Sequence, residues 1–194
     1  MINKSTIIKS LCITLLIFFA GCSGIRVSQD YKPSRSFDQV KTYAWKSDKQ
    51  EKTGDVRIDS PLMDERIRTA VDSALSAKGF IKSSENPDVV IAYHYSLRSK
   101  ISSSSNGPAI GFGFGTISRN SAIGFSTGVG SDINQYDEGQ LVIDMNEVKT
   151  NDLIWRGTST SRVETQAKPE RTTRLINDMV KKNLDQFPPD KKSN

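Results

Sequence analysis

Hydrophobic and polar residues alternate most regularly in residues 139–157. In a first arm, one face carries Leu141, Ile143 and Met145. In a second arm, the alternation places Leu153 and Trp155 on one face, and Ile154 and Arg156 on the other. A polar run, Lys149-Thr150-Asn151-Asp152, separates the arms and is typical of a turn. The pattern therefore predicts a β-hairpin.

Two other segments repeat apolar residues at helical spacing. The first follows Ser60-Pro61, which suit a helix cap and first turn, and it ends at Gly79, which suits a left-handed cap. The second begins at Lys168-Pro169 and ends before Pro188-Pro189. Their apolar positions are Met63, Ile67, Ala70, Val71, Ala74 and Leu75 in the first, and Leu175, Ile176, Met179, Val180, Leu184 and Phe187 in the second. A sheet beside each helix would cover such a face.

Strand character is also strong in residues 37–45 and from Pro87 to about Leu97. Together these elements predict an α+β fold, with a mainly antiparallel sheet and two amphipathic helices packed on one face. The expected order is β-α-β, then glycine-rich β-arms, then β-β-α.

The N-terminus has the pattern of a bacterial export signal. Lys4 and Lys9 precede an apolar run that is too short to span a membrane and ends in Phe19-Ala20-Gly21-Cys22. This ending resembles the lipobox, in which the signal is cut before a cysteine that is then acylated. Ser23 follows, which resembles an outer-membrane sorting address. We expect lipid on Cys22 to anchor the protein in the membrane; the alternative is an ordinary signal peptide.

These patterns divide the chain into a signal peptide (1–21), a lipid anchor and tether (22–36), a single periplasmic domain (37–189) and a charged tail (190–194). Within the domain, residues 101–131 form a Gly/Ser-rich insertion.

Composition narrows the possible partners. The formal net charge of +5 falls to +3 when the signal and its two lysines are removed, and the basic residues are scattered among acidic ones. We therefore expect no nucleic-acid binding. Cys12 leaves with the signal, so Cys22 has no partner for a disulfide within the chain.

The Gly/Ser-rich insertion repeats itself, because Ala109-Ile110-Gly111-Phe112 recurs as Ala122-Ile123-Gly124-Phe125. Two short β-arms and a flexible low-complexity excursion both fit this pattern. The apolar residues that we expect to form a contact surface for an envelope partner are Ile110, Phe112, Phe114 and Phe125.

Catalytic machinery is not evident in the sequence. Gly124 to Gly128 matches the G-x-S-x-G elbow around Ser126, but no helix pattern follows and the sole histidine, His94, lies upstream. A half-exposed strand position is the favoured interpretation of His94, over a general base or metal ligand. The sequence therefore predicts no catalytic residue, metal site or cofactor.

Several short segments, in this order, resemble a bacterial lipoprotein family known as domain of unknown function 4136 (DUF4136). They are Lys41-Thr42-Tyr43-Ala44-Trp45, Ala77-Lys78-Gly79-Phe80, Asn86-Pro87-Asp88-Val89-Val90, Gly139 to Asp144, Leu153-Ile154-Trp155-Arg156-Gly157 and Phe187-Pro188-Pro189. The resemblance implies a lipidated envelope protein and implies no activity.

The leading hypothesis is a non-enzymatic, lipid-anchored binding or structural module, on the outer membrane and facing the periplasm. One alternative is an envelope hydrolase or glycan-modifying enzyme, which requires Asp88 with Asp144, or Ser126 with His94, to converge. Another is a carrier of a small hydrophobic ligand, which requires an apolar cavity between sheet and helices.

Overall fold

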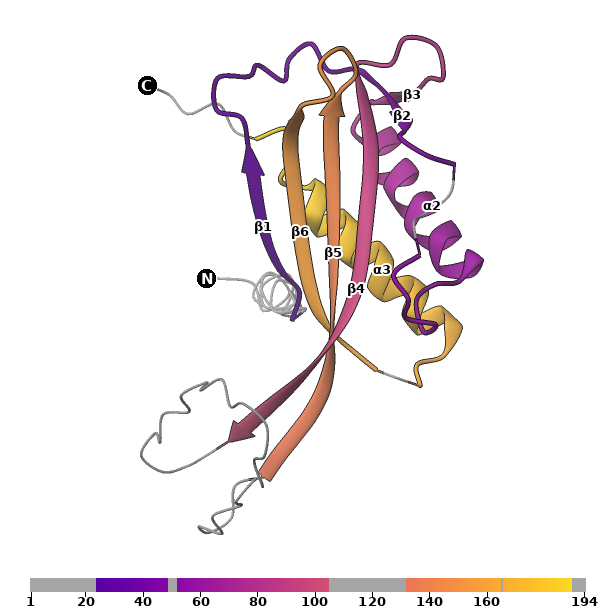
Figure 1. Ribbon diagram of the computed structural model, residues 1–194, viewed down its shortest axis with the longest axis vertical. Coiled ribbons are helices and arrows are strands. Elements are labelled where there is room, and N and C mark those ends of the chain that lie inside the picture. The colour runs from indigo at the N-terminus through magenta and orange to yellow at the C-terminus, as the bar shows by residue number, and fades with distance from the viewer. Residues whose placement is uncertain (1–23, 49–51, 105–131, 165, 190–194) are drawn as a thin grey trace, which may run out of the picture.

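The computed structural model describes residues 24–48, 52–104, 132–164 and 166–189. They form one sheet with two helices packed against the same face (Figure 1). The α+β fold predicted from the sequence is confirmed. The elements are β1 (Arg26–Tyr31), β2 (Thr42–Trp45), α2 (Pro61–Ala77), β3 (Ile81–Lys82), β4 (Val89–Ser104), β5 (Asp132–Glu147), β6 (Leu153–Val163) and α3 (Pro169–Leu184).

The six strands lie in the order β1-β6-β5-β4-β2-β3. Neighbours from β1 to β4 are antiparallel, whereas β2 is parallel to both β4 and β3. The parallel pairs follow from α2, which carries the chain from one end of β2 back across the sheet before β3 and β4 begin. The sheet is therefore mixed and mostly antiparallel.

Local signals in the sequence set both ends of α2. The hydroxyl of Ser60 accepts a hydrogen bond from the Met63 N–H at 3.2 Å, and a proline opens the helix. Gly79 ends it at φ +84°. The N–H of Gly79 donates to the Ser76 carbonyl at 2.9 Å and that of Phe80 donates to Leu75 at 3.0 Å, which is a Schellman motif. The predicted helix start and cap are confirmed.

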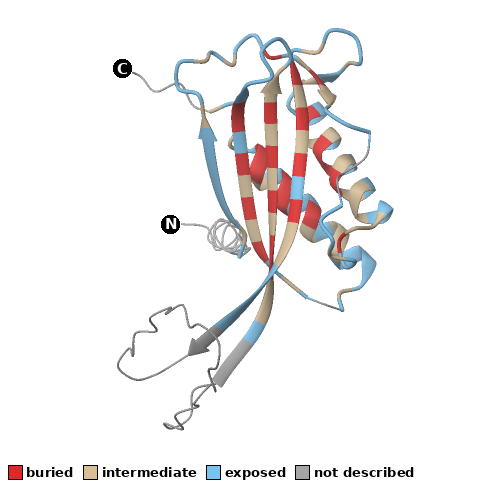
Figure 2. Cartoon of the chain, viewed as in Figure 1, coloured by how far each residue is buried: buried red, intermediate tan, exposed pale blue. Residues whose placement is uncertain are grey.

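The core lies between the sheet and the two helices. Alternate residues of the central strands are buried there (Figure 2). Phe187, just beyond α3, packs its ring against Trp155 with 5.2 Å between centroids, and Phe37 and Phe80 lie at 5.6 and 5.5 Å from it. Residues far apart in sequence are thereby joined around one aromatic cluster.

The structure corrects the prediction for the tether. Residues 26–31 form β1, which pairs along β6 with Arg26 opposite Thr160 and Tyr31 opposite Trp155. This strand lies at the edge of the sheet, and all of its residues before Tyr31 are exposed. Its sequence therefore lacks the alternation of apolar and polar residues by which a strand is recognised. The folded part of the chain therefore begins before residue 37, and its first strand starts four residues after Cys22.

The second hairpin arm also differs from its prediction. Ile154 and Trp155 are both buried, whereas Leu153 is 41% exposed. The register explains this, because Met145 is opposite Trp155 and Asn146 is opposite Leu153. Ile154 is therefore the extra residue of a β-bulge, and strict alternation fails there. The first arm is as predicted, with Leu141, Ile143 and Met145 buried.

Strands β4 and β5 continue beyond the rest of the sheet as a two-stranded arm (Figure 1). The sequence predicts an end of β4 near Leu97, but its pairing with β5 extends to Ser104 opposite Asp132. The glycine-rich segment between the two strands lies outside the described residues. We call the end of the domain from which these strands project the arm end.

Candidate functional site

A cleft of about 470 Å³ opens at the arm end of the domain, between the sheet and the first turns of both helices. Its volume lies within the range of small-molecule sites, roughly 300–1,000 Å³. Buried or half-buried apolar side chains form its floor, among them Ile58, Met63, Tyr95, Leu97, Leu175 and Ile176. Charged side chains surround this floor, among them Arg57, Asp137, Arg162, Glu164, Arg171 and Arg174. The arrangement suits a ligand with both an apolar part and a charged part.

Tyr95 is the polar group of the cleft floor. It is 4% exposed, and its hydroxyl has no hydrogen-bond partner among the described residues. A methyl group added at Gly139 would lie 2.6 Å from that hydroxyl, so glycine leaves the space that the phenol occupies. Burial raises the pKa of Tyr95 to about 12. The hydroxyl is therefore protonated at neutral pH and able to donate a hydrogen bond.

The other buried tyrosine hydroxyls are satisfied by acids of α2. Tyr93 donates to Asp64 at 2.7 Å and Tyr43 donates to Asp72 at 2.9 Å. Burial and the neighbouring carboxylate raise the pKa of both phenols. Tyr95 differs from them because it faces the cleft and meets no acceptor among the described residues there.

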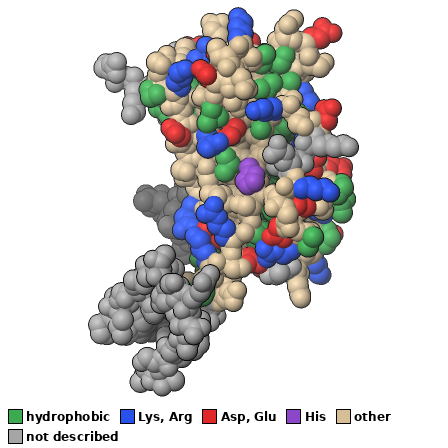
Figure 3. Space-filling model, in the orientation of Figure 1, with side chains coloured by type: hydrophobic (Ala, Val, Ile, Leu, Met, Phe, Trp, Pro, Cys, Tyr) green, Lys and Arg blue, Asp and Glu red, His purple; other side chains and the backbone are tan. Residues whose placement is uncertain are grey.

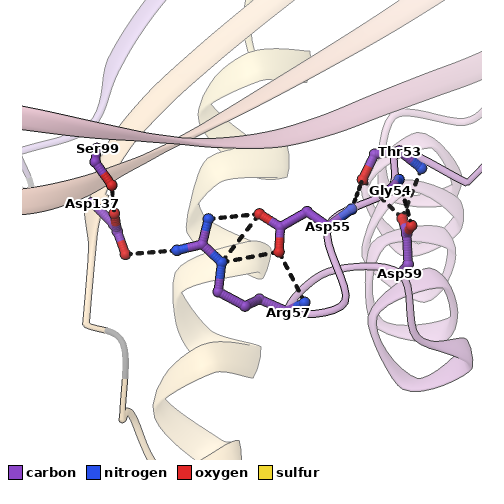
Figure 4. Close-up of polar contacts among 7 residues, drawn as sticks. All are labelled: Thr53, Gly54, Asp55, Arg57, Asp59, Ser99 and Asp137. Carbon is purple, nitrogen blue, oxygen red and sulfur yellow. Dashed lines mark hydrogen bonds and ion pairs between the residues drawn. The ribbon is translucent and has the colours of Figure 1, made fainter.

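One wall of the cleft is held in place by Arg57, which lies in the loop before α2 (Figure 4). Its guanidinium pairs with Asp55 on the same loop and with Asp137 of β5 at 3.0 Å. Ser99 of β4 donates to Asp137 at 2.6 Å. The hydrogen bonds from Arg57 lower the pKa of Asp55. This network ties the loop to the two strands where they enter the arm.

The remaining arginines of the cleft are bound less tightly. Arg171 pairs with Glu164 at 3.1 Å. The guanidinium carbon of Arg162 lies 4.7 Å from the centre of the Tyr136 ring. Arg174 is exposed and forms no ion pair within the described ranges. Its charge is therefore available to a ligand.

The sheet face opposite the helices carries a second charged feature at the arm end. Arg26 and Lys100 both contact the buried carboxylate of Glu138, with Lys100 at 2.6 Å. Arg98 and Arg162 lie directly opposite Glu138 on the two neighbouring strands. Basic side chains gather on this face in Figure 3. We call these four cations around one carboxylate the basic cluster.

His94 lies exposed on the same open face, opposite Val142 of β5 (Figure 3). This agrees with the interpretation that the sequence favoured, a strand residue facing solvent. Its suggested partner Ser126 lies outside the described residues. Within the described ranges, no group of three or more His, Cys, Asp or Glu side chains could hold a metal ion.

The two carboxylates considered for catalysis have structural partners. Asp144 forms two 2.6 Å hydrogen bonds with Arg156, directly across β5 and β6. Asp88 accepts from the N–H groups of Lys41 and Thr42, both at 2.9 Å, and these bonds lower its pKa. Asp144 is opposite Ala92, four residues further along the chain than Asp88, which is roughly 13 Å of strand. Their separation exceeds that of paired glycosidase carboxylates, roughly 10 Å at most.

The predicted anchor and contact residues are not placed by the structure. Cys22, Ile110, Phe112, Phe114 and Phe125 all lie outside the described residues. Conversely, sequence reasoning missed the cleft. The residues that line the cleft come from segments distant in the chain. Only residues 162–178, which are rich in arginines and acids, place several lining residues close together in the sequence.

The fold and cleft define a small α+β domain whose sheet is covered by helices on one face. The chain belongs to the family described as domain of unknown function (DUF4136), whose model matches residues 27–189. No curated protein matches it. Within the described residues, no helix is long and apolar enough to cross a membrane.

Solved structures with related shapes share little sequence with this chain. A PDZ domain protein from Parabacteroides distasonis is 13% identical with a TM-score of 0.49, and the match covers 86% of this chain but 36% of that one. Two PelC dodecamer structures from Paraburkholderia phytofirmans are 12% and 13% identical, with TM-scores of 0.44 and 0.46. Each of these matches covers 82% of this chain and 94% of PelC.

Proposed function

We propose that this protein is a lipid-anchored, non-enzymatic binding module of the bacterial envelope, held on the outer membrane by lipid on Cys22 and facing the periplasm. The observation that carries the proposal is the lipobox-like sequence ending at Cys22, followed closely by the first strand of the domain. Four residues reach at most about 14 Å, so the start of β1 would lie next to the bilayer.

The basic cluster supports this orientation. Arg26 belongs to it, so the cluster lies at the place where the chain leaves the anchor. Basic side chains beside an anchor are attracted to anionic headgroups, by about 1 kcal/mol for each residue near the surface. The lipid and the cluster would act on the same end of the domain.

The partner contact that we propose is the glycine-rich segment between β4 and β5. Ile110, Phe112, Phe114 and Phe125 supply its apolar side chains. The two strands that flank this segment pair with each other as far as Ser104 and Asp132, beyond the rest of the sheet. An envelope protein is the partner class that fits, since the anchor confines the domain to the periplasmic face of a membrane.

The anchor is tested by expressing the full chain in a Gram-negative host with labelled palmitate. Cys22→Ala should abolish labelling and leave the protein uncleaved or released from the membrane fraction. Cys12→Ala is the matched control, because that cysteine lies within the predicted signal and should not affect labelling. Persistent labelling of the Cys22→Ala protein would overturn the proposal.

The contact surface is tested separately by crosslinking in cells and identification of captured proteins by mass spectrometry. A chain with residues 107–130 deleted should lose its envelope partner while keeping its lipid. The surface is assigned wrongly if every crosslinked partner is retained.

A further inference from the structure

We propose that the cleft at the arm end binds a single-chain anionic amphiphile, a molecule with one acyl chain and an acidic headgroup. The inference goes beyond the anchoring role, because it concerns residues of the folded domain and does not depend on lipid at Cys22. It rests on the apolar floor, the unpartnered hydroxyl of Tyr95 and the charge of the rim.

The floor provides a site for an acyl chain. Leu97, Leu175 and Met63 are only partly buried by the protein and line the cleft between sheet and helices. Removing the remaining apolar surface of such side chains from water is favourable. A bound chain would cover these residues, whereas a small polar ligand would leave them in contact with water.

Tyr95 provides a donor for a headgroup oxygen. A hydroxyl that loses contact with water without gaining a partner is costly, so a ligand that enters the cleft must bring an acceptor to it. The raised pKa keeps the proton on the phenol. An ester, carboxylate or phosphate oxygen meets this requirement, and a plain hydrocarbon does not.

The rim gives the preference for negative charge. Two of the lining arginines are already paired, Arg57 with Asp55 and Asp137, and Arg171 with Glu164. Arg174 is exposed and has no ion-pair partner among the described residues. Arg174 therefore offers an unpaired positive charge at the rim, which complements an acidic headgroup.

Direct binding tests this proposal on the mature chain, residues 22–194, with Cys22→Ser. This variant keeps the whole described domain and avoids competition from a bilayer. Oleate, oleyl alcohol and oleoyl-lysophosphatidylglycerol are titrated below their aggregation concentrations by calorimetry. We expect both anions to bind at least tenfold more tightly than the neutral alcohol. The ratio between the two anions then shows whether a carboxylate or a phosphate headgroup fits better.

Two variants assign the binding to the cleft. Tyr95→Phe should weaken binding of the preferred anion about tenfold or more, the expected loss of a hydrogen bond to a charged acceptor. Arg174→Gln should weaken both anions and leave the alcohol unchanged. The matched controls, Tyr93→Phe and Lys181→Gln, change a tyrosine of β4 and a cation of α3 that do not line the cleft. Both controls should bind like the parent chain.

Thermal unfolding confirms that each variant is folded before it is titrated. If Tyr95→Phe does not fold, Ala167→Trp takes its place. Ala167 is a half-buried residue of the cleft lining, so the larger side chain should fill the cleft and abolish binding. Absence of anion binding to the parent chain would overturn the proposal. Equal affinity for the alcohol and the anions, or binding unaffected by the cleft variants, would overturn it too.

Discussion

The indole of Trp155 lies over Gly157, two residues further along β6, and the side chain of Asn183 approaches the same glycine from α3. A methyl group at this position would overlap both side chains. Gly157 therefore sets how closely α3 packs on the sheet, and the buried ring of Trp155 fills the space that remains.

Gly157→Ala should lower the free energy of unfolding by about 1–3 kcal/mol, because the added carbon forces the packed helix or indole to move. Urea denaturation monitored by tryptophan fluorescence measures the change. Gly24→Ala is the matched control, since a methyl group there meets nothing within 4 Å. Equal stability of the two variants would show that α3 can adjust without cost.

Asp72 joins α2 to the sheet through three donors. Its carboxylate accepts from the Tyr43 hydroxyl at 2.9 Å, the Trp45 indole N–H at 3.1 Å and Lys82 at 2.8 Å. Asp72→Ala should destabilise the protein by about 1–3 kcal/mol, because the hydroxyl of buried Tyr43 loses its acceptor.

Chemical denaturation checks this expectation against Glu65→Ala, which removes an exposed acid of the same helix. We expect the control to stay within about 0.5 kcal/mol of the wild type. A loss as large as that of Asp72→Ala would indicate a general effect of helix charge.

Asp88 should make stability depend on pH in the acid range. Its folded-state pKa is lowered below the ordinary value of 3.8, chiefly by hydrogen bonds from the backbone of Lys41 and Thr42. The carboxylate therefore stabilises the fold fully above that value, and the contribution is lost as pH falls through the folded-state pKa.

Urea unfolding at several pH values between 7 and 2.5 tests the sign. The stability difference between wild type and Asp88→Asn should be greatest above pH 4 and shrink as the pH falls. Glu85→Gln, a nearby exposed acid, should follow the wild-type curve. A difference that grows on acidification contradicts the assigned direction.

The pair of Asp144 and Arg156 lies on the open face, with side chains 23% and 47% exposed. Water screens such a pair, so we expect a coupling free energy of about 0.5–1 kcal/mol. A double-mutant cycle with Asp144→Ala and Arg156→Ala measures it, and 1 M salt should reduce it. Coupling above about 2 kcal/mol would mean that the pair is shielded, for example by a partner on this face.

The elements whose signals are local could be predicted from the sequence. Ser60, Pro61 and Gly79 determine the ends of α2 through their own backbone and side-chain geometry. In α3 the apolar residues recur at helical spacing, and in β5 Leu141, Ile143 and Met145 occupy alternate positions. In both segments these apolar residues form the buried face. For these segments, neighbouring residues carry the information.

The parts that depend on distant partners could not be predicted. β1 is an exposed edge strand, and only its hydrogen bonds to β6 reveal it. The bulge at Ile154 arises from the register between two strands, so alternation alone gave the wrong face for Leu153. The cleft needs α2, α3 and three strands in place before its floor exists.

The directions of α2 and α3 have an electrical consequence. Both helices begin at the arm end (Figure 1), where Arg66 contacts Thr173, and Lys78 reaches the Phe187 carbonyl at the opposite end. Each helix carries about half a positive charge at its N-terminus, so the two macrodipoles add. The positive ends of both dipoles therefore lie side by side at the arm end, where they favour a negatively charged group close to the first turns of the helices.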